Sequence, residues 1–422
     1  MTNVKTQVFK LDELNPAKYN PRKKLKPGDK EFEKLKKSIQ NFGYVELIVV
    51  NVANNNTVIS GHQRLSVLKH LGETEAECVV VELNENDEKA LNIAMNKVTG
   101  SWDEQKLADL LVDLGRMNFD LDLTGFEAPE VDTLLSNVHD KKVTEDDFDV
   151  DAELKQPVFS QSGDIWHLGR HKVLCGDSTI AVTYERLMDG EKANLVLTDP
   201  PYGVDVQETA GKIQNDNLPD DKFYDFLLAA FKNMYDNLAN DGSIYVWHAD
   251  TKGLIFRQAY KDAGFYLSGC CIWKKNSLVL GRSPYQWQHE PCLFGWKLKG
   301  KHQWYSDRKQ TTIWEYDRPK SSPEHPTMKT ISLMAYPIKN STMTNGIVLD
   351  PFLGSGSTLI ACCETDRICR GVELDPKFVD CIVKRYIEWN GGKYDDVFVI
   401  RDGQKLKFDE VATFEPEEKP HS

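Results

Sequence analysis

The sequence predicts an α/β protein with a doubly wound, mostly parallel sheet, preceded by a small α/β domain. From about residue 158 onward, apolar strand patterns alternate with helix-period segments, which is typical of a parallel sheet covered by helices. Residues 1–95 carry shorter strand patterns and a helix that stops at Gly72. An acidic stretch separates the two regions, and 422 residues suffice for two or three domains.

The domain boundaries follow changes in composition. We expect an α/β domain over 1–95, a helical extension over 96–138 and an acidic linker over 139–156 that ends at Gln156-Pro157. A large domain over 157–405 and a tail over 406–422 complete the chain.

Individual elements follow from hydrophobic periodicity. In the first domain the expected elements are three strands and one helix, namely Val45–Val52, Thr57–Ile59, Cys78–Leu83 and Gln63–Leu71. The expected strands of the large domain are His171–Cys175, Asn194–Thr198, Ser243–Trp247, Tyr266–Trp273, Gly346–Leu349 and Cys369–Glu373. Its expected helices are Lys222–Leu238, Thr251–Ala263, Ser357–Thr365 and Pro376–Trp389.

Composition excludes several classes of protein. No apolar run is long enough to span a bilayer, so we expect a cytoplasmic protein without a membrane partner. The nine cysteines include no C-x-x-C pair, which argues against a zinc site or a disulfide framework. The net charge is −13, yet residues 251–340 hold 15 Lys and Arg against 6 Asp and Glu, a local excess suited to a polyanion.

The first chemical motif is a glycine turn after an apolar strand, Asp350-Pro-Phe352-Leu-Gly354-Ser-Gly356-Ser357. Glycines let the backbone approach a ligand, and the following helix offers free N–H groups. About twenty residues later Glu373 ends another strand, a spacing suited to a carboxylate that binds ribose hydroxyls. The motif by itself indicates only an adenosine-like cofactor, and a nicotinamide-dependent dehydrogenase is one alternative.

The second motif is Asp199-Pro200-Pro201-Tyr202, directly after the strand pattern Asn194–Thr198. Proline cannot donate to a sheet, so two consecutive prolines fix a stiff turn. The Asp199 carboxylate and the Pro200 carbonyl are then two acceptors beside an aromatic ring. This arrangement suits a planar base with an exocyclic amine, whose lone pair becomes available when both hydrogens are bound.

These residues resemble the DNA amino-methyltransferases that act on adenine N6 or cytosine N4. The Asp-Pro-Pro-Tyr sequence resembles their catalytic motif and the glycine turn their cofactor motif, in the order of the circularly permuted beta class. The resemblance spans about 164–402 and also includes Gly176-Asp177-Ser178, Ile272-Trp273-Lys274-Lys275, His289-Glu290 and His325-Pro326-Thr-Met-Lys329. Thr330 follows where the family usually has proline.

The resemblance implies a Rossmann-like methyltransferase fold, S-adenosylmethionine as cofactor, and double-stranded DNA with a flipped-out base as substrate. The family's roles transfer motif by motif. Asp199 and Pro200 would hold the amine, Tyr202 would stack on the base, and Trp273 would lie on its other face. The cofactor would contact Asp177, Asp350, Phe352, Gly354, Gly356, Ser357 and Glu373. Aspartate in first place favours adenine, with cytosine N4 as the alternative.

Family members keep their target-recognition region where this chain has residues 275–325. Cations and tryptophans are interleaved there, a pattern that suits phosphates and bases. The expected DNA contacts are Lys275, Arg282, Arg308 and Lys309. An RNA methyltransferase is an alternative, but those enzymes usually lack such a long basic insert. Beta-class resemblance implies a homodimer, and the lack of a nuclease motif suggests an enzyme carried by a phage or mobile element without a restriction partner.

The N-terminal domain resembles that of ParB-type partition proteins over residues 5–95. Leu14-Asn15-Pro16, Tyr19-Asn20-Pro21-Arg22 and Ser60-Gly61-His62-Gln63-Arg64 carry the resemblance. Gly61, His62 and Arg64 would form an anion site at a helix start. His-Gln replaces the usual Glu-Arg, so a nucleotide ligand and a docking or DNA-tethering role, with a protein partner, stand side by side. A DNA-binding regulator with an inactive methyltransferase domain is a further alternative, but Asp199 and the glycines are intact.

Overall fold

The chain forms two compact units, residues 1–140 and 141–422. The structure is a computed structural model, and it describes residues 5–96, 102–116, 121–126, 130–131, 134, 143–203, 207–208, 211–212, 218–279, 284–317 and 328–412. Each unit is considered by itself.

The N-terminal unit contains a five-stranded sheet in the order β1-β5-β3-β4-β2. Its strands are β1 (Lys5–Lys10), β2 (Asn15–Pro16), β3 (Ile48–Asn51), β4 (Thr57–Ser60) and β5 (Glu75–Val81). Its helices are α1 (Lys30–Phe42), α2 (His62–Leu71), α3 (Glu85–Asn96) and α4 (Glu104–Arg116), with short 3₁₀ turns at Leu11–Glu13 and Leu121–Thr124. The three strands and the helix expected from the sequence are present, with ends shifted by up to three residues.

The second unit is built on an eleven-stranded sheet in the order β14-β12-β13-β11-β8-β15-β16-β7-β6-β17-β18. Its strands are β6 (Ile165–Leu168), β7 (His171–Cys175), β8 (Ala193–Thr198), β11 (Leu238–Trp247), β12 (Phe265–Val279), β13 (Trp287–Lys297), β14 (Ile313–Glu315), β15 (Ile347–Asp350), β16 (Ile368–Glu373), β17 (Val397–Arg401) and β18 (Gln404–Lys407). A separate short hairpin joins β9 (Gln207–Glu208) and β10 (Gly211–Lys212).

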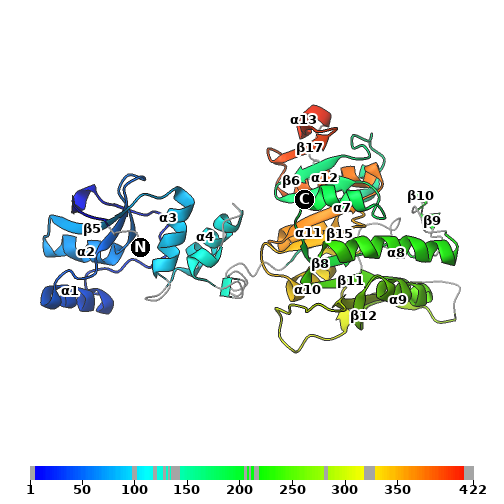
Figure 1. Cartoon of the computed structure of the whole chain (residues 1–422), viewed down its shortest axis with the longest axis horizontal. Helices are drawn as coiled ribbons and strands as arrows, with labels where there is room; N and C mark the ends of the chain where they lie inside the picture. Colours follow the sequence, from blue (N-terminus) through cyan, green and yellow to red (C-terminus); the bar gives the residue numbers. More distant parts are fainter. Residues whose placement is uncertain are drawn as a thin grey trace, which may run out of the picture. The chain divides into compact units, whose positions relative to one another are not determined.

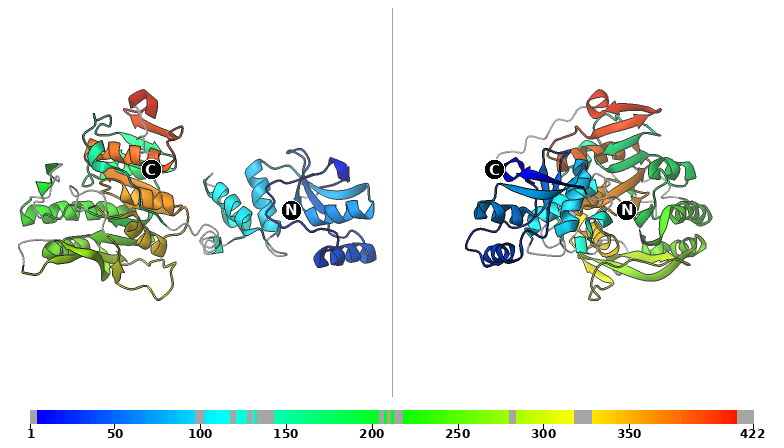
Figure 2. Two further views of the ribbon diagram at one scale, coloured as in Figure 1. Left: turned by 180° about the vertical axis from the view of Figure 1, so that it is seen from behind. Right: turned by 60° about the vertical axis from the view of Figure 1, so that its left-hand side comes forward.

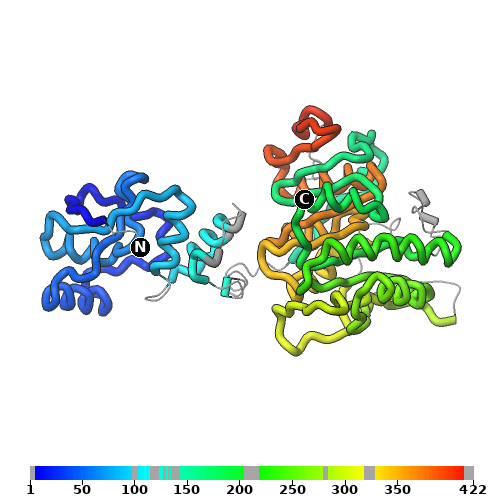
Figure 3. The backbone as a smooth tube through the Cα atoms, in the orientation of Figure 1, coloured from blue at the N-terminus to red at the C-terminus, as the bar shows by residue number. Residues whose placement is uncertain are grey.

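The centre of the large sheet is parallel, and its two edges are mostly antiparallel. Strands β11, β8, β15, β16 and β7 run parallel to one another. Antiparallel pairings join β13 to β11 and β12 on one side and β6 to β7 and β17 on the other. In Figure 3 the yellow-green strands and the red C-terminal residues lie at opposite ends of this sheet.

Helices cover both faces of the large sheet. Residues of α7 (Ala181–Met188), α8 (Asp220–Asn237) and α9 (Gly253–Asp262) belong to one core cluster. Residues of α10 (Ile331–Ser341), α11 (Ser357–Glu364) and α12 (Pro376–Trp389) belong to the other. Figures 1 and 2 show α8 and α9 side by side on one face. The doubly wound α/β architecture predicted from the sequence is therefore present.

The predicted acidic linker needs correction over residues 143–155, because that segment packs on the second unit. The Glu145 carboxylate accepts hydrogen bonds from the backbone N–H groups of Ile331 (2.8 Å) and Ser332 (2.9 Å) at the start of α10. Glu153 pairs with Lys384 at 2.7 Å, and Val150 of the short helix α6 (Val150–Glu153) is buried. Composition suggested solvated acids, whereas these side chains have specific partners far away in the sequence.

Two further boundaries differ from expectation. The expected tail begins inside ordered structure, because β18 pairs with β17 and Phe408 of α13 (Phe408–Val411) is buried in the core. The expected target-recognition insert is partly sheet, since β13 lies between β11 and β12. Its consecutive residues Cys292 and Leu293 are both buried, one in each of the two core clusters, so the strand is covered on both faces.

Candidate active site at the carboxyl ends of the central strands

The two motifs come together because their strands are neighbours. Strands β8, β15, β16 and β7 are adjacent and parallel, so their carboxyl ends lie along one edge of the sheet. Asp199, the glycine turn and Asp177 follow β8, β15 and β7, and Glu373 is the last residue of β16. Ligands of doubly wound sheets bind at this edge. The predicted catalytic and cofactor residues thus belong to one region.

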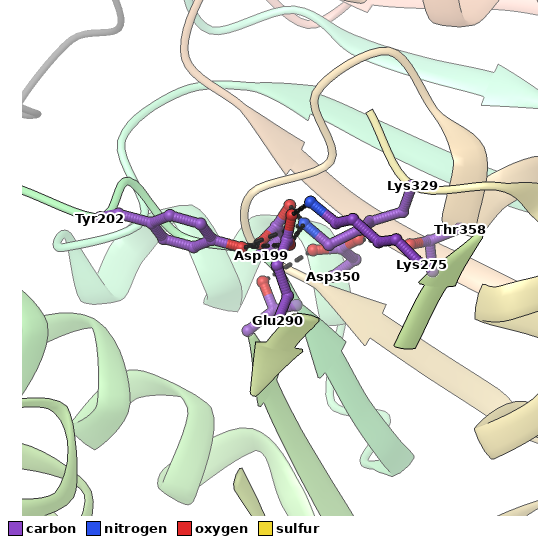
Figure 4. A network of polar contacts seen from close by, with 8 residues as sticks. Asp199, Tyr202, Lys275, Glu290, Lys329, Asp350 and Thr358 are labelled. Carbon is purple, nitrogen blue, oxygen red and sulfur yellow. Dashed lines mark hydrogen bonds and ion pairs between the residues drawn. The ribbon is translucent and has the colours of Figure 1, made fainter. Parts of the chain in front are cut away.

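Asp199 lies at the centre of a buried network of charged groups (Figure 4). Its Oδ2 accepts a hydrogen bond from the Lys329 ammonium at 2.6 Å, and its Oδ1 accepts one from the Tyr202 hydroxyl at 2.6 Å. Lys329 is also 2.9 Å from the Glu290 carboxylate, which in turn pairs with the Lys275 ammonium. We call Asp199, Lys275, Glu290 and Lys329 the ion network.

Burial and partners shift the pKa values of this network in opposite directions. Burial raises the pKa of Asp199, while the Lys329 cation acts to lower it. Lys329 and Lys275 hold the pKa of Glu290 at about 2 despite its burial. The two carboxylates raise the pKa of Lys329 despite its burial. Glu290 is therefore ionised and Lys329 protonated near neutral pH.

Asp350 has a different position from the one expected. It is only 2% exposed and accepts hydrogen bonds from the hydroxyls of Thr198 (2.7 Å) and Thr358 (2.6 Å) and from the N–H of Phe352 (3.1 Å). Burial raises its pKa to about 6. Asp350 therefore ties β8 and α11 to its own strand, so its carboxylate shapes the glycine turn without lining it.

The glycine turn has the backbone that its sequence predicts. Gly354 and Gly356 have φ values of 54° and 89°, a region that favours glycine. A Cβ on Gly356 would approach Ile382 to 3.1 Å, whereas one on Gly354 would meet no atom within 4 Å. The space at Gly354 is suited to a ligand, and buried Ser357 begins α11 directly after the turn.

Glu373 lies beside the same turn. Its two carboxylate oxygens accept hydrogen bonds at 2.9 Å from the N–H groups of Gly354 and Asp375. Burial raises its pKa to about 7. The carboxylate is thus held at the ends of β15 and β16, with lone pairs left to accept hydroxyl hydrogens.

Asp177 follows β7 and accepts hydrogen bonds at 2.8 Å from the N–H and hydroxyl of Thr179. The neighbouring Ser178 hydroxyl donates to the carbonyl of Pro351, which joins this loop to the glycine turn. The Phe352 ring packs against Phe226 at 5.8 Å. The predicted cofactor residues other than Asp350 therefore surround the ends of β7, β15 and β16.

Two residues predicted to contact the base or DNA, Trp273 and Lys275, are buried in the protein, so these two predictions are wrong. Trp273 is 1% exposed, and its indole N–H donates to the carbonyl of Tyr316 at 2.8 Å, so its ring belongs to the core. Lys275 is buried against Glu290 and its ammonium lies 4.9 Å from the Trp273 ring centre, so it cannot meet phosphate. Both point inward because β12 is a strand covered on that face.

The remaining predicted DNA contacts divide into two groups. Arg308 and Lys309 are exposed, as is Trp304, so this part of the basic region presents cations and a ring to solvent. Arg282 lies outside the described residues, as do His325 and Pro326. The local positive excess is smaller at the surface than in the sequence, because Lys275, Lys297 and Lys329 are buried.

The predicted anion site of the N-terminal unit is not free to bind an anion through Arg64. The Arg64 guanidinium donates to the carbonyls of Glu46 (2.7 Å) and Leu47 (2.9 Å) and pairs with the Glu46 carboxylate (2.9 Å). His62 accepts a hydrogen bond from the Ala17 N–H at 3.2 Å, and burial lowers its pKa to about 4. Gly61 has the expected positive φ of 94°.

The sequence motifs assign no role to Glu290 or Lys329, although both residues lie within motifs of the methyltransferase resemblance. Glu290 is a charge inside the apolar strand β13, and Lys329 directly precedes the helix α10. A charged residue inside a buried strand indicates that a residue of opposite charge lies beside it, but the sequence does not identify that partner.

Among the described residues, no group of three or more His, Cys, Asp or Glu is placed to hold a metal ion. In the same part of the chain, no helix has both the length and the apolar character needed to cross a membrane.

Comparison with known proteins identifies three regions. Residues 193–384 match the family model described as DNA methylase, residues 105–162 match the ParB-methyltransferase HTH domain, and residues 1–97 match the ParB N-terminal domain. The Type II methyltransferase M.HpaI of Haemophilus parainfluenzae is 24% identical over 245 residues, which cover 52% of this chain and 76% of that protein.

Two further similarities fall in the same half of the chain. The Type II methyltransferase M2.MboI of Moraxella bovis is 26% identical over 234 residues, 46% of this chain and 81% of that protein. The solved structure of the M1.HpyAVI-SAM complex is 23% identical, with a TM-score of 0.39, and the match covers 50% of this chain and 98% of that one.

The match over residues 193–384 identifies a DNA methylase domain of the N6-adenine/N4-cytosine family. This chain carries that methylase domain behind a ParB N-terminal domain and a ParB-methyltransferase HTH domain, and these domains imply DNA binding. The HTH match over 105–162 overlaps the expected helical extension and includes the acidic segment.

Proposed function

We propose that this chain transfers a methyl group from S-adenosylmethionine to the exocyclic N6 of adenine in DNA. The observation that carries the proposal is the position of Asp199. It directly follows the central strand β8, which pairs with β15 ahead of the glycine turn, and its carboxylate is fixed through both oxygens. Aspartate in the first place of the motif favours adenine over cytosine.

The chemistry follows from the poor nucleophilicity of an aromatic amine. The Asp199 carboxylate would accept one amine hydrogen and the Pro200 carbonyl the other, which keeps the nitrogen lone pair out of the ring system. Each Asp199 oxygen accepts one hydrogen bond within the protein, so each retains a further lone pair for the substrate. Pro201 keeps this turn stiff.

When bound, S-adenosylmethionine supplies an electrophilic methyl group on a sulfonium. The nitrogen–carbon bond forms as the carbon–sulfur bond breaks, and the nitrogen then loses one proton. Asp199 is the carboxylate nearest to that proton in this scheme, and its raised pKa suits a transient acceptor. The Tyr202 ring would stack on the base after it leaves the duplex.

The site has the donor set that the cofactor requires. Glu373 would bind the ribose hydroxyls and Asp177 the adenine, while Phe352, Gly354, Gly356 and Ser357 would line the methionine and adenosine path. The open space at Gly354 and the fixed carboxylate of Glu373 are the observations that fit this group. Asp350 would stabilise the glycine turn through its buried hydrogen bonds without lining the cofactor site.

DNA would reach the site through exposed residues of the basic region. Trp304, Arg308 and Lys309 are exposed and supply a ring and two cations. We also propose that the N-terminal module tethers the enzyme to DNA or to a protein partner, and that the methyltransferase acts as a homodimer.

The test is single-molecule sequencing of DNA from a methylation-free bacterial host that expresses this chain, with Asp199→Ala as the inactive control. We expect a methylated adenine motif in DNA from the wild-type culture and none from the variant. Mass spectrometry of the nucleosides distinguishes N6-methyladenine from N4-methylcytosine. Modified cytosine alone would keep the mechanism and overturn the choice of base, while no modification by a folded protein would overturn DNA as substrate.

A further inference from the structure

Three charged side chains from separate segments gather around the Asp199 carboxylate and form the ion network with it (Figure 4). Asp199 directly follows β8, Lys275 is in β12, Glu290 is in β13, and Lys329 directly precedes the N-cap of α10. Their side chains are 24%, 6%, 14% and 3% exposed, in that order. Asp199 is therefore the member that solvent reaches most, and the other three lie behind it.

The Lys329 ammonium contacts oxygen atoms of three residues of the site. Its Nζ is 2.6 Å from Asp199 Oδ2, 2.9 Å from Glu290 Oε2 and 3.0 Å from the Tyr202 hydroxyl. One side chain thus binds both the carboxylate that would receive the amine hydrogen and the tyrosine whose ring would stack on the base. An ammonium held in this way fixes the relative position of the two groups.

Glu290 provides the second half of the arrangement. It binds Lys329 and Lys275 and approaches the Tyr202 hydroxyl to 3.3 Å. A buried ammonium without a counter-charge is strongly unfavourable, so Glu290 and Lys275 balance Lys329 and Asp199. A charge-balanced set can remain buried while Asp199 stays ionised.

We propose that Lys329 and Glu290 are positioning residues for methyl transfer. Lys329 holds Asp199 and Tyr202 in one arrangement and keeps the carboxylate ionised, and Glu290 holds Lys329 in place. This inference rests on the proposed function, since it assigns to Asp199 the binding of the substrate amine.

The two residues have opposite electrostatic effects on Asp199, which gives a sharp test. Lys329 lowers the pKa of Asp199 and Glu290 raises it. The other groups that face this carboxylate are the Tyr202 hydroxyl, the Asp350 carboxyl on β15 and the Cys292 thiol on β13. These remain unchanged in the variants below.

The experiment measures kcat and KM of the full chain on duplex DNA from pH 5 to pH 9, for wild type, Lys329→Met, Lys329→Arg and Glu290→Gln. Lys329→Met should lower kcat at neutral pH by about 100-fold and move the acid limb of the kcat profile upward by about 1–3 pH units, as loss of an adjacent opposite charge does. Lys329→Arg should keep the acid limb of the kcat profile near its wild-type pH. Glu290→Gln should move this limb to lower pH. KM for DNA should change less than kcat.

Lys339→Met is the matched control, because Lys339 is an exposed lysine of α10. It should leave the profile unchanged. An acid limb that stays in place in Lys329→Met, or that moves in the same direction in Lys329→Met and Glu290→Gln, would overturn the proposal. A purely structural defect would lower activity without moving the acid limbs of the two variants in opposite directions. The direction of these pH shifts therefore distinguishes a positioning role from a purely structural one.

A second readout is independent of turnover. A ¹³C-NMR titration of the Asp199 carboxyl, assigned by its loss in Asp199→Asn, should show the same opposite shifts in Lys329→Met and Glu290→Gln. If Lys329→Met does not fold, Glu290→Gln and Lys329→Arg carry the test. Wild-type protein without any methylation activity would overturn the proposed function, while the titration would still decide whether Lys329 controls Asp199.

Discussion

Asp146 and Arg385 form a doubly hydrogen-bonded ion pair, with Nε–Oδ2 and Nη2–Oδ1 distances of 2.6 and 2.9 Å. The same guanidinium donates to the carbonyl of Ser355 at 2.9 Å and to the Ser357 hydroxyl at 3.4 Å, within and just after the glycine turn. The acidic segment therefore holds the turn in place through one arginine. This segment belongs to the second unit, and it lies inside the HTH match.

Asp146→Asn should weaken binding of S-adenosylmethionine by about 5- to 20-fold, because loss of a hydrogen-bonded charge partner costs about 1–2 kcal/mol at a partly exposed site. Titration calorimetry measures the affinity. Asp147→Asn is the control, since Asp147 is an exposed acid next in the sequence and makes the same change in charge. Equal losses in both variants would show that net charge, and not the Arg385 contact, matters.

Tyr202→Phe separates the hydroxyl from the ring. The ring remains to stack on a base, whereas the hydrogen bond to Asp199 is lost, so we expect kcat to fall by about 10- to 100-fold with little change in KM for DNA. Steady-state kinetics measure both constants. Tyr285→Phe, at an exposed tyrosine, should have no effect. A rise in KM with unchanged kcat would mean that the hydroxyl serves DNA binding instead.

Glu373 predicts a pH dependence of stability in the cofactor-free protein. Its pKa rises from the usual 4.5 to about 7 on folding, so the folded state binds the proton more tightly. Its contribution is therefore present at low pH and falls as pH rises from about 4.5 to about 7. The free energy of unfolding of Glu373→Gln minus that of wild type should increase across this window by about 1–3 kcal/mol. Urea denaturation at pH 4.5, 6 and 8 measures it, and a constant difference would refute the shift.

The N-terminal unit should show no nucleotide-dependent stabilisation that relies on Arg64, because that guanidinium is engaged by Glu46 and Leu47. Thermal denaturation with ATP, CTP or GTP at millimolar concentration should leave its Tm within about 1 °C, since Tm rises only when a ligand binds the folded state. A clear rise in Tm that disappears in Arg64→Ala would show that the arginine can exchange its backbone partners for phosphate.

The sequence was most informative where function depends on consecutive residues. The segments Asp199–Tyr202 and Asp350–Ser357 each combine a strand end with a turn, and local propensity determines both. His171–Cys175 and Pro376–Trp389 have the boundaries predicted for them. The helix Ser357–Glu364 ends one residue earlier than expected.

Other features depended on packing between distant segments. From the sequence Lys275 was a DNA-binding cation and 139–156 a solvated linker, because like charges in a row are usually exposed. The folded chain instead places Glu290 beside Lys275 and Lys329, and Arg385 beside Asp146. The partners are 15 to 239 residues apart, and no local pattern encodes which of them meet.

The sequence by itself therefore determined the α/β class from the alternation of strands and helices, and the glycine turn and the Asp199–Tyr202 turn from a few consecutive residues each. Only the tertiary structure showed which charged side chains are buried around Asp199 and that Trp273 belongs to the core. It also showed that Asp350 is buried and stabilises the glycine turn through hydrogen bonds without lining it. The physical reason is that burial and charge pairing depend on strand order, which brings residues from β8, β12, β13 and the start of α10 to one place.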